Sequence, residues 1–415
     1  MTAIVGVLNK HAVAIAADSA VTMGNTHKVV NSANKIFTLS KYHPVAVMTY
    51  SSASFMGVPW DIVIKEYRKQ LKNKCFAMLE YYVNDFVKYM RKEHFFCDKK
   101  TQETYLRWML ESFFDICCNE ICNENHKDKN ALEDTLIEQK LVDCIKKNKA
   151  ANKCPDFNSY SFVDFKKYAE TAIQSFANEK SFTNVDLLSE SFFYYLSVEI
   201  LTYSYTGLVF VGYGEKEIYP SLIPVNISPL VIDGHLKYFI DQNNVAKISE
   251  HGSTAVISPF AQIDVVQTII KGINPSFQDI IYNVIEKSIE SYTNAITTIL
   301  DKDPGTIVIS TAVKNLDKKS VINDITSLIN REMFNLYSRP LIDTVAHLDK
   351  EDMANMAESF ISLTSLVRRM QPGEETVGGP VDVAVISKGD GFVWINRKHY
   401  FKPELNASFF NNYFK

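Results

Sequence analysis

The sequence predicts an α+β protein whose sheets are antiparallel and whose helices occupy separate stretches of the chain. Two observations support this class. Short strand-like segments occur toward both ends of the chain, whereas apolar residues recur at helical spacing from about residue 60 to residue 200. Hairpins, then helices, then hairpins again favour layered antiparallel sheets over a doubly wound parallel sheet.

The first 60 residues are predicted to form strands. Residues 3–8 and 12–17 are runs of small and branched apolar residues around a short polar turn, so we expect a hairpin. A second strand pair is expected at residues 28–30 and 35–39, followed by a strand at residues 44–49.

Helices are predicted from Pro59 onward, because apolar residues then recur every three or four positions, at Trp60, Val63, Ile64 and Tyr67. Helical segments are expected to continue to about residue 200.

Strand character returns at residues 208–214 and 221–225, and a turn at Asp233 and Gly234 is expected to join another short pair. Pro259 is predicted to begin a helix with an apolar face. Residues 274–345 carry a mixed pattern.

The most regular helical pattern is at residues 349–370, where apolar residues alternate at spacings of three and four and Asp349 can act as the N-cap. Residues 381–386 and 391–395 flank a Gly-Asp-Gly turn and are predicted to form a closing hairpin.

Composition excludes several classes of protein. The 415 residues are 46% hydrophobic and 22% charged, with 15 Gly and 13 Pro, which is typical of a globular chain and excludes a disordered or collagen-like one. A net charge of −4 gives no sign of a nucleic-acid surface or a basic membrane patch. All seven cysteines lie between Cys75 and Cys154, unlike an extracellular disulfide framework, and no apolar run is long enough to cross a membrane. We expect a cytoplasmic protein that binds neither nucleic acid nor membrane.

Thr2 is the first candidate for chemistry. Removal of Met1 would leave a threonine whose hydroxyl and free α-amine belong to the same residue. A threonine hydroxyl is a weak nucleophile and needs a base, and an α-amine with a pKa of about 7.7–8.0 is partly neutral at cytosolic pH. Thr2 is therefore predicted to be a nucleophile that carries its own general base.

Asp18 and Lys35 are the expected partners of Thr2. A nearby cation would lower the pKa of the amine, and a carboxylate would hold that cation in place. Asp18 ends one predicted strand and Lys35 begins another, so adjacent antiparallel strands could bring both back to residue 2. Taken singly, Asp18 is more typical of a turn and Lys35 of a solvated strand start than of a catalytic site.

The combination of these segments resembles the proteasome β-type subunits. The resemblance is carried by residues 2–7 (TAIVGV), 15–19 (IAADS), 22–25 (TMGN) and 34–36 (NKI). It continues with further segments in the same order at residues 208–213, 258–260, 367–370, 378–386 and 388–393. The series is similar both to archaeal β subunits and to the bacterial ring protease that works with an unfoldase.

This resemblance implies the four-layer αββα sandwich of N-terminal-nucleophile hydrolases, with large, mainly helical insertions. The implied core is discontinuous and comprises residues 2–72, 206–272 and 346–396. Residues 73–205 would be a helical insertion, residues 273–345 a second insertion, and residues 397–415 a C-terminal tail.

The resemblance also implies roles for individual residues. Thr2, Asp18 and Lys35 match the nucleophile and its two partners. Thr22 lies where the family aligns its substrate, and Thr49 matches a glycine whose backbone N–H helps to form the oxyanion hole.

The supporting residues depart from the family pattern. A family serine falls on Val256 in an ungapped match, and Ser258 is the candidate substitute. A family aspartate near the double glycine falls on Glu374, which keeps the charge on a longer side chain.

No cofactor or metal is expected. Cys118, Cys122 and His126 share helical spacing, but without a fourth ligand this pattern favours buried thiols over a zinc site.

The sequence thus favours a threonine-type peptidase acting on polypeptides or peptides. An amidohydrolase acting on a small amide or a single protein site, and a non-catalytic ring or scaffold subunit, remain as alternatives. From the resemblance we expect a homo-oligomer. A ring assembly, and an ATP-dependent unfoldase or another regulator as partner, are compatible with the same resemblance.

Overall fold

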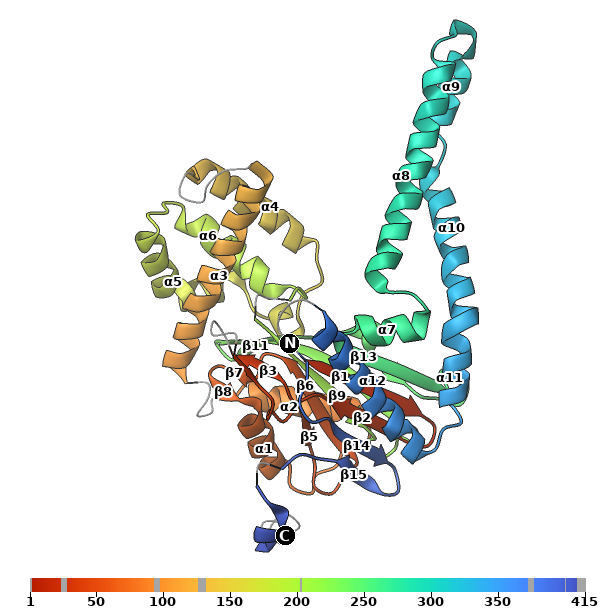
Figure 1. The fold of residues 1–415 in the computed structure, drawn as a ribbon. Coiled ribbons are helices and arrows are strands. Elements are labelled where there is room, and N and C mark those ends of the chain that lie inside the picture. Colours follow the sequence, from red (N-terminus) through yellow and green to blue (C-terminus); the bar gives the residue numbers. More distant parts are fainter. Residues whose placement is uncertain are drawn as a thin grey trace.

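The computed structural model describes residues 2–23, 28–92, 98–125, 132–201, 204–371, 377–399 and 401–408. Two antiparallel sheets form its centre, with helices against them and two groups of helices that project from them (Figure 1). The prediction of a mixed fold with antiparallel sheets is confirmed.

The first sheet has the strand order β13-β1-β2-β14-β15. Its strands are β1 (Ala3–Asn9), β2 (Val13–Ala17), β13 (Ala255–Ala261), β14 (Asp382–Ser387) and β15 (Gly391–Asn396). The predicted hairpins at both ends of the chain are therefore present, and β2 pairs with β14 from Ala17↔Asp382 to Val13↔Ile386. The two ends of the chain thus form one sheet.

The second sheet has the strand order β11-β10-β9-β6-β5, with β12 paired to β10. Its strands are β5 (Ile36–Thr38), β6 (Val45–Ser51), β9 (Thr206–Gly212), β10 (Ser221–Ile232), β11 (His235–Ile240) and β12 (Ala246–Lys247). Asp233 and Gly234 have φ values of 49° and 74° and turn β10 into β11, as predicted.

Two short ladders lie outside these sheets: β3 (Val21–Met23) pairs with β4 (Lys28–Val30), and β7 (Ser54–Phe55) pairs with β8 (Val58–Pro59). The predicted pairing of residues 28–30 with 35–39 is wrong. Residues 28–30 pair back to β3, whereas β5 pairs with β6.

The described residues contain twelve α-helices. They are α1 (Trp60–Leu71), α2 (Leu79–Met90), α3 (Lys99–Asn125), α4 (Asp134–Lys149), α5 (Phe162–Glu179), α6 (Val185–Ser197), α7 (Asp264–Lys271), α8 (Pro275–Leu300), α9 (Ile307–Lys314), α10 (Lys318–Met333), α11 (Arg339–Val345) and α12 (Lys350–Met370). A π-helical turn, η6 (Phe334–Ser338), joins α10 to α11.

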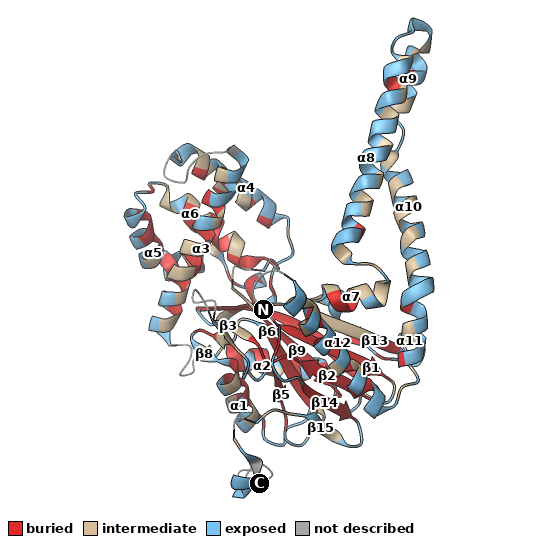
Figure 2. Cartoon of the chain, viewed as in Figure 1, coloured by how far each residue is buried: buried red, intermediate tan, exposed pale blue. Residues whose placement is uncertain are grey.

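Alternation along the strands builds the core on both faces of each sheet. In β2, Val13, Ile15 and Ala17 pack between the two sheets, whereas Ala14 and Ala16 pack under α12. The second sheet packs its other face against α1 and α2. Buried residues accordingly concentrate at the sheets and the helices against them, and a further buried cluster lies among α3, α4, α5 and α6 (Figure 2).

Two sequence expectations about helices have different outcomes. Asp349 caps α12 by accepting a hydrogen bond from the Asp352 N–H at 2.9 Å, as predicted. The predicted helix start at Pro259 is wrong, because Pro259 lies inside β13, opposite Val5. The helix begins instead at Asp264, since pairing with β1 keeps the chain extended up to Ala261.

Candidate functional site

Thr2 is buried at the start of β1, with an exposed fraction of 4%. Its carbonyl accepts a hydrogen bond from the Gln262 N–H at 3.2 Å. On the other side of β1, the N–H of Ala3 donates to Asp18 Oδ1 at 2.9 Å, and Asp18 N–H donates back to the Ala3 carbonyl at 3.1 Å. The peptide that follows Thr2 is therefore held from both neighbouring strands.

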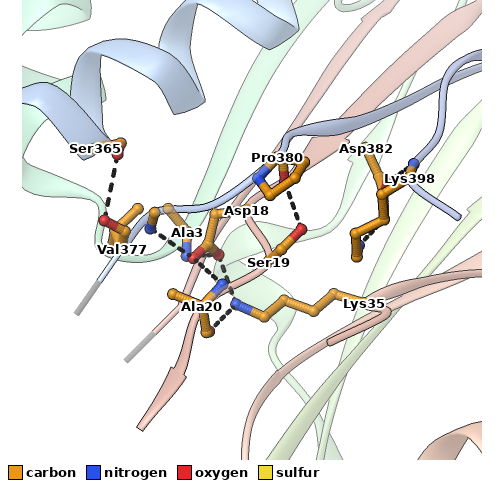
Figure 3. Close-up of polar contacts among 11 residues, drawn as sticks. Ala3, Asp18, Ser19, Ala20, Lys35, Ser365, Val377, Pro380, Asp382 and Lys398 are labelled. Carbon is orange, nitrogen blue, oxygen red and sulfur yellow. Dashed lines mark hydrogen bonds and ion pairs between the residues drawn. The ribbon is translucent and has the colours of Figure 1, made fainter. Parts of the chain in front are cut away.

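Asp18 connects the segments that form the site. Its carboxylate is 1% exposed and accepts four hydrogen bonds. Oδ1 accepts from the Ala3 N–H and, at 2.6 Å, from Lys35 Nζ, while Oδ2 accepts from the N–H groups of Ala20 at 3.1 Å and Gly378 at 3.2 Å (Figure 3). Backbone donors from three segments thus fix the orientation of this carboxylate.

Lys35 reaches Asp18 from the loop before β5. Its Nζ donates to Asp18 Oδ1 and, also at 2.6 Å, to the Ala20 carbonyl, and the residue is 4% exposed. The Ala3 nitrogen and Lys35 Nζ contact the same oxygen, so they are no farther apart than the sum of those two distances. Loss of hydration on burial lowers the pKa of Lys35 below its ordinary value, against the opposing effect of Asp18.

The segment before β14 closes the site from the C-terminal part of the chain. Ser19 N–H donates to the Gly378 carbonyl at 3.0 Å, and Ser19 Oγ donates to the Pro380 carbonyl (Figure 3). Gly379 has a φ of 74°, and a Cβ there would lie 2.8 Å from Asn31 Cβ. Only glycine lets this segment lie so close to Ser19 and Asn31 without a shift.

The structure therefore places Asp18 and Lys35 together beside the peptide that follows Thr2, and the roles of the three residues stay predictions. Sequence reasoning missed the backbone N–H of Gly378 and the residue Gln262. The double glycine was a signal for the first, because such a segment permits close backbone approach.

Thr49 does not supply the predicted oxyanion donor. Its N–H donates to the Lys35 carbonyl at 2.9 Å, as a continuation of the pairing between β5 and β6. A backbone donor already used in a sheet ladder is not available to substrate. An oxyanion donor has to come from another group.

Ser258 does not lie beside Thr2. It pairs with Gly6 in the β1–β13 ladder, four residues along β1 from Thr2, which is roughly 13 Å of strand. Val256 lies farther still, opposite Leu8. The prediction of Ser258 as a supporting residue is wrong because β13 runs on to Ala261, which places Gln262 next to Thr2.

For two other predicted site residues, Thr22 and Glu374, the structure describes little or nothing. Thr22 lies in β3 and pairs with Val29. Glu374 and Met1 lie outside the described residues.

A cavity of about 960 Å³ borders β13 on the side away from β2. Tyr50 forms part of its wall, stacks on Phe260 with ring centroids 5.8 Å apart and contacts Tyr205 edge to face. Ala261 and Ile263, which flank Gln262, line the same cavity. One wall of this space is therefore next to residue 2.

The described residues contain no group of three or more His, Cys, Asp or Glu side chains arranged to hold a metal ion. Cys118 and Cys122 lie on α3, and His126 falls outside the described residues. Among the described helices, none combines the length and the hydrophobicity needed to cross a bilayer.

Comparisons with known proteins give structural neighbours only. No family model matches the chain, and no curated protein matches its sequence. Similar solved structures include Anbu (ancestral beta-subunit) from Yersinia bercovieri, with a TM-score of 0.31, and Anbu from Hyphomicrobium sp. strain MC1, with a TM-score of 0.30. Each is 8% identical to this chain over 99% of this chain and 94% of the other.

These findings contradict the family membership that the motif series predicted. The neighbours are neither archaeal proteasome β subunits nor the bacterial two-component ring protease, and their TM-scores are too low to support an argument about activity. The chain is therefore not assigned to the proteasome β-type family. Its function has to be inferred from the geometry of its own residues.

Proposed function

We propose that this chain hydrolyses amide bonds in peptides or polypeptides, with Thr2 as the nucleophile after removal of Met1. One observation carries the proposal: Asp18 Oδ1 accepts from both the Ala3 N–H and Lys35 Nζ, which puts a buried ammonium group beside residue 2. Such a cation lowers the pKa of a neighbouring α-amine, so the amine can act as a base near neutral pH.

The proposed reaction begins when Thr2 Oγ attacks the substrate carbonyl and passes its proton to the α-amine of the same residue. The new Oγ–C bond forms a tetrahedral intermediate. Its C–N bond then breaks as the ammonium returns a proton to the leaving amine. Water, deprotonated by the same amine, hydrolyses the resulting ester and restores the hydroxyl.

Lys35 and Asp18 act on this cycle through charge and position. Two of the three N–H bonds of Lys35 point to Asp18 and Ala20, so the third can point to Thr2. Asp18 fixes the ammonium and is itself fixed by three backbone N–H groups. The proposal assigns Asp18 a positioning role and leaves the chemistry to Thr2.

The architecture supports this assignment. Helices pack on the outer face of each sheet and a third apolar cluster lies between the sheets. We propose that these layers form a four-layer αββα sandwich of the N-terminal-nucleophile type. We propose that residues 2–72, 206–272 and 346–396 form this core and that residues 397–415 are a tail. We propose that helical insertions occupy residues 73–205 and 273–345; within the first of these ranges, α2 packs against the second sheet.

A peptide that approaches Thr2 along β13 would meet the aromatic wall formed by Tyr50, Phe260 and Tyr205. This favours peptide substrates with an apolar side chain near the cleaved bond. The proposal requires no cofactor, and it extends to a cytoplasmic enzyme whose substrates are delivered by an unfoldase or another regulator.

The test is intact-mass spectrometry after incubation with a peptide epoxyketone, which reacts with both the hydroxyl and the amine of an N-terminal threonine. We expect a mass that lacks Met1 and carries one adduct. Thr2→Ala should take up none, Thr2→Ser should retain labelling, and the distant exposed Thr298→Ala should label like the wild type.

Asp18→Asn removes the charge that holds Lys35. Because its amide keeps only one of the two oxygens that accept from backbone N–H groups, urea denaturation must first show that the variant is folded. In a folded variant Lys35 has lost its charged partner, so labelling should slow. A folded protein that keeps Met1 and takes up no adduct would refute the hydrolase proposal and favour the scaffold alternative. Adduct formation with cleavage of small amides alone would favour the amidohydrolase.

A further inference from the structure

The segment from Pro275 to Ser338 forms a helical arm that stands away from the sheets (Figure 1). It comprises α8, α9, α10 and η6, and α8 alone is about 39 Å long at 1.5 Å per residue. The base of the arm is anchored, since Ser338 Oγ donates to the Ile270 carbonyl of α7 at 2.8 Å. The arm is therefore an ordered projection from the core.

None of the apolar residues of the arm is fully buried. Only four of its residues are buried, and all four are polar: Gln278, Thr297, Ser310 and Ser338. Polar contacts hold its two ends, with Asp301 bound to Ser310 and Lys314 at the tip and Gln278 bound to Asn330 near the base. Helices in water owe most of their stability to burial of an apolar face, which this arm alone does not provide.

Much of the arm is exposed (Figure 2), including many of its large apolar side chains. Fourteen of the twenty-nine large hydrophobic side chains that are exposed among the described residues lie on it. They are Phe277, Ile280, Val284, Tyr292, Ile299, Ile307, Val308, Ile309, Leu316, Val321, Leu328, Phe334, Leu336 and Tyr337.

On α8 these residues form a stripe beside the face that packs on α10. Phe277, Ile280 and Val284 are spaced by three and four, and Ile299 continues the stripe. Ile281 and Ile285, which are half-buried, lie on the α10 side. Two adjacent apolar seams on one helix are what a four-helix bundle requires, because each of its helices packs against two neighbours.

We propose that the arm is a self-association element, in which arms from two copies of this chain pack together as a four-helix bundle. At about 70 Å² of exposed apolar surface per side chain, fourteen residues expose on the order of 1,000 Å². That is of the same order as the roughly 800 Å² per partner that a stable protein–protein interface buries.

The charges of the arm favour a second copy over a partner of another kind. It carries eight acidic and six basic residues, so it presents no strong field of one sign that would select nucleic acid, an anionic membrane or a highly charged protein. Near-balanced charge also allows two identical arms to approach without strong repulsion. A closed contact between the same surfaces of two copies then covers both.

The experiment is sedimentation velocity of the full chain over a range of micromolar concentrations. Ile280→Lys with Tyr292→Lys places two charges in the stripe, and Asn283→Lys with Asn294→Lys places the same two charges on polar positions of α8. We expect the wild type and the control to associate, and the stripe variant to dissociate with a constant raised about 100-fold.

A second measurement guards against misfolding of the variant. Hydrogen exchange of the arm amides in the wild type should slow as protein concentration rises, while exchange in the sheets stays constant. A wild type that is monomeric throughout, or a stripe variant that associates like the control, would overturn the proposal. Thr2→Ala should associate like the wild type, so this test is independent of the proposed hydrolase.

Discussion

Removing either partner of the buried pair formed by Asp18 and Lys35 should destabilise the fold, but by different amounts. Both side chains are at most 4% exposed. Asp18→Ala leaves the ammonium of Lys35 without a charged hydrogen-bond partner among the described residues, with the Ala20 carbonyl still accepting from it, and an uncompensated buried charge costs about 3–5 kcal/mol. Lys35→Met leaves the carboxylate with three backbone donors, so the loss is about one charge-assisted hydrogen bond, ~2 kcal/mol.

The double variant separates the pair from its surroundings. Once Asp18 is absent, the buried ammonium of Lys35 is itself destabilising. The double variant Asp18→Ala with Lys35→Met should therefore lose less unfolding free energy than the sum of the losses in the two single variants. The coupling should be about 2 kcal/mol. Urea denaturation followed by tryptophan fluorescence measures all four proteins, because Trp60 lies in the core against the second sheet.

Two results would refute this reasoning. Additive losses in the double variant would mean that the two side chains do not interact energetically. A Lys35→Met protein less stable than Asp18→Ala would mean that the backbone donors do not sustain the carboxylate.

Three further predictions concern other parts of the fold. Burial lowers the pKa of Lys237 to about 8, so between pH 8 and about 10.5 the unfolded chain binds one more proton than the folded chain. The free energy of unfolding should therefore rise by about 3 kcal/mol across that pH range, as measured by urea titrations. Lys237→Met should remove this rise. Gly379→Ala should cost about 1–2 kcal/mol in the same assay because of its positive φ and its contact with Asn31, whereas Gly389→Ala, with open space around it, should cost little; equal effects would contradict the strain argument. The sulfurs of Cys117 and Cys144 lie 4.0 Å apart, and the hydrogen bond from Cys117 lowers the pKa of Cys144. Diamide should therefore oxidise the two thiols to a disulfide with loss of two hydrogens. Peptide mapping that finds both thiols unchanged would contradict this prediction.

Local sequence patterns predicted some features of the site and missed others. The strand ends at Asp18 and Lys35 and the double glycine before β14 were recognisable, because turn residues and alternation are local properties. The position of Gln262 was not, because β13 pairs with β1 across about 250 residues of intervening chain. Nothing between residues 255 and 262 indicates how far that pairing extends, so the sequence pointed to Ser258 and to a helix at Pro259.

Thr49 illustrates the same limit within a single hairpin. Its residue type and spacing from Lys35 could be counted, but the direction of its N–H depends on the register between β5 and β6. A shift of one residue reverses that direction, since successive backbone groups point to opposite sides of a strand. Sequence spacing therefore identified Thr49, but strand pairing decided that its backbone N–H is not free to bind substrate.

The sequence by itself determined the class of fold, the terminal hairpins and the cap of α12. These follow from alternation, capping and the chemistry of single side chains, which act over a few residues. Only the tertiary structure decided which strand lies beside β1, which backbone donors hold Asp18, and that residues 275–338 form an exposed arm and not a packed layer. Those outcomes depend on contacts between segments far apart in the chain, where many pairings satisfy the same local pattern and burial selects one.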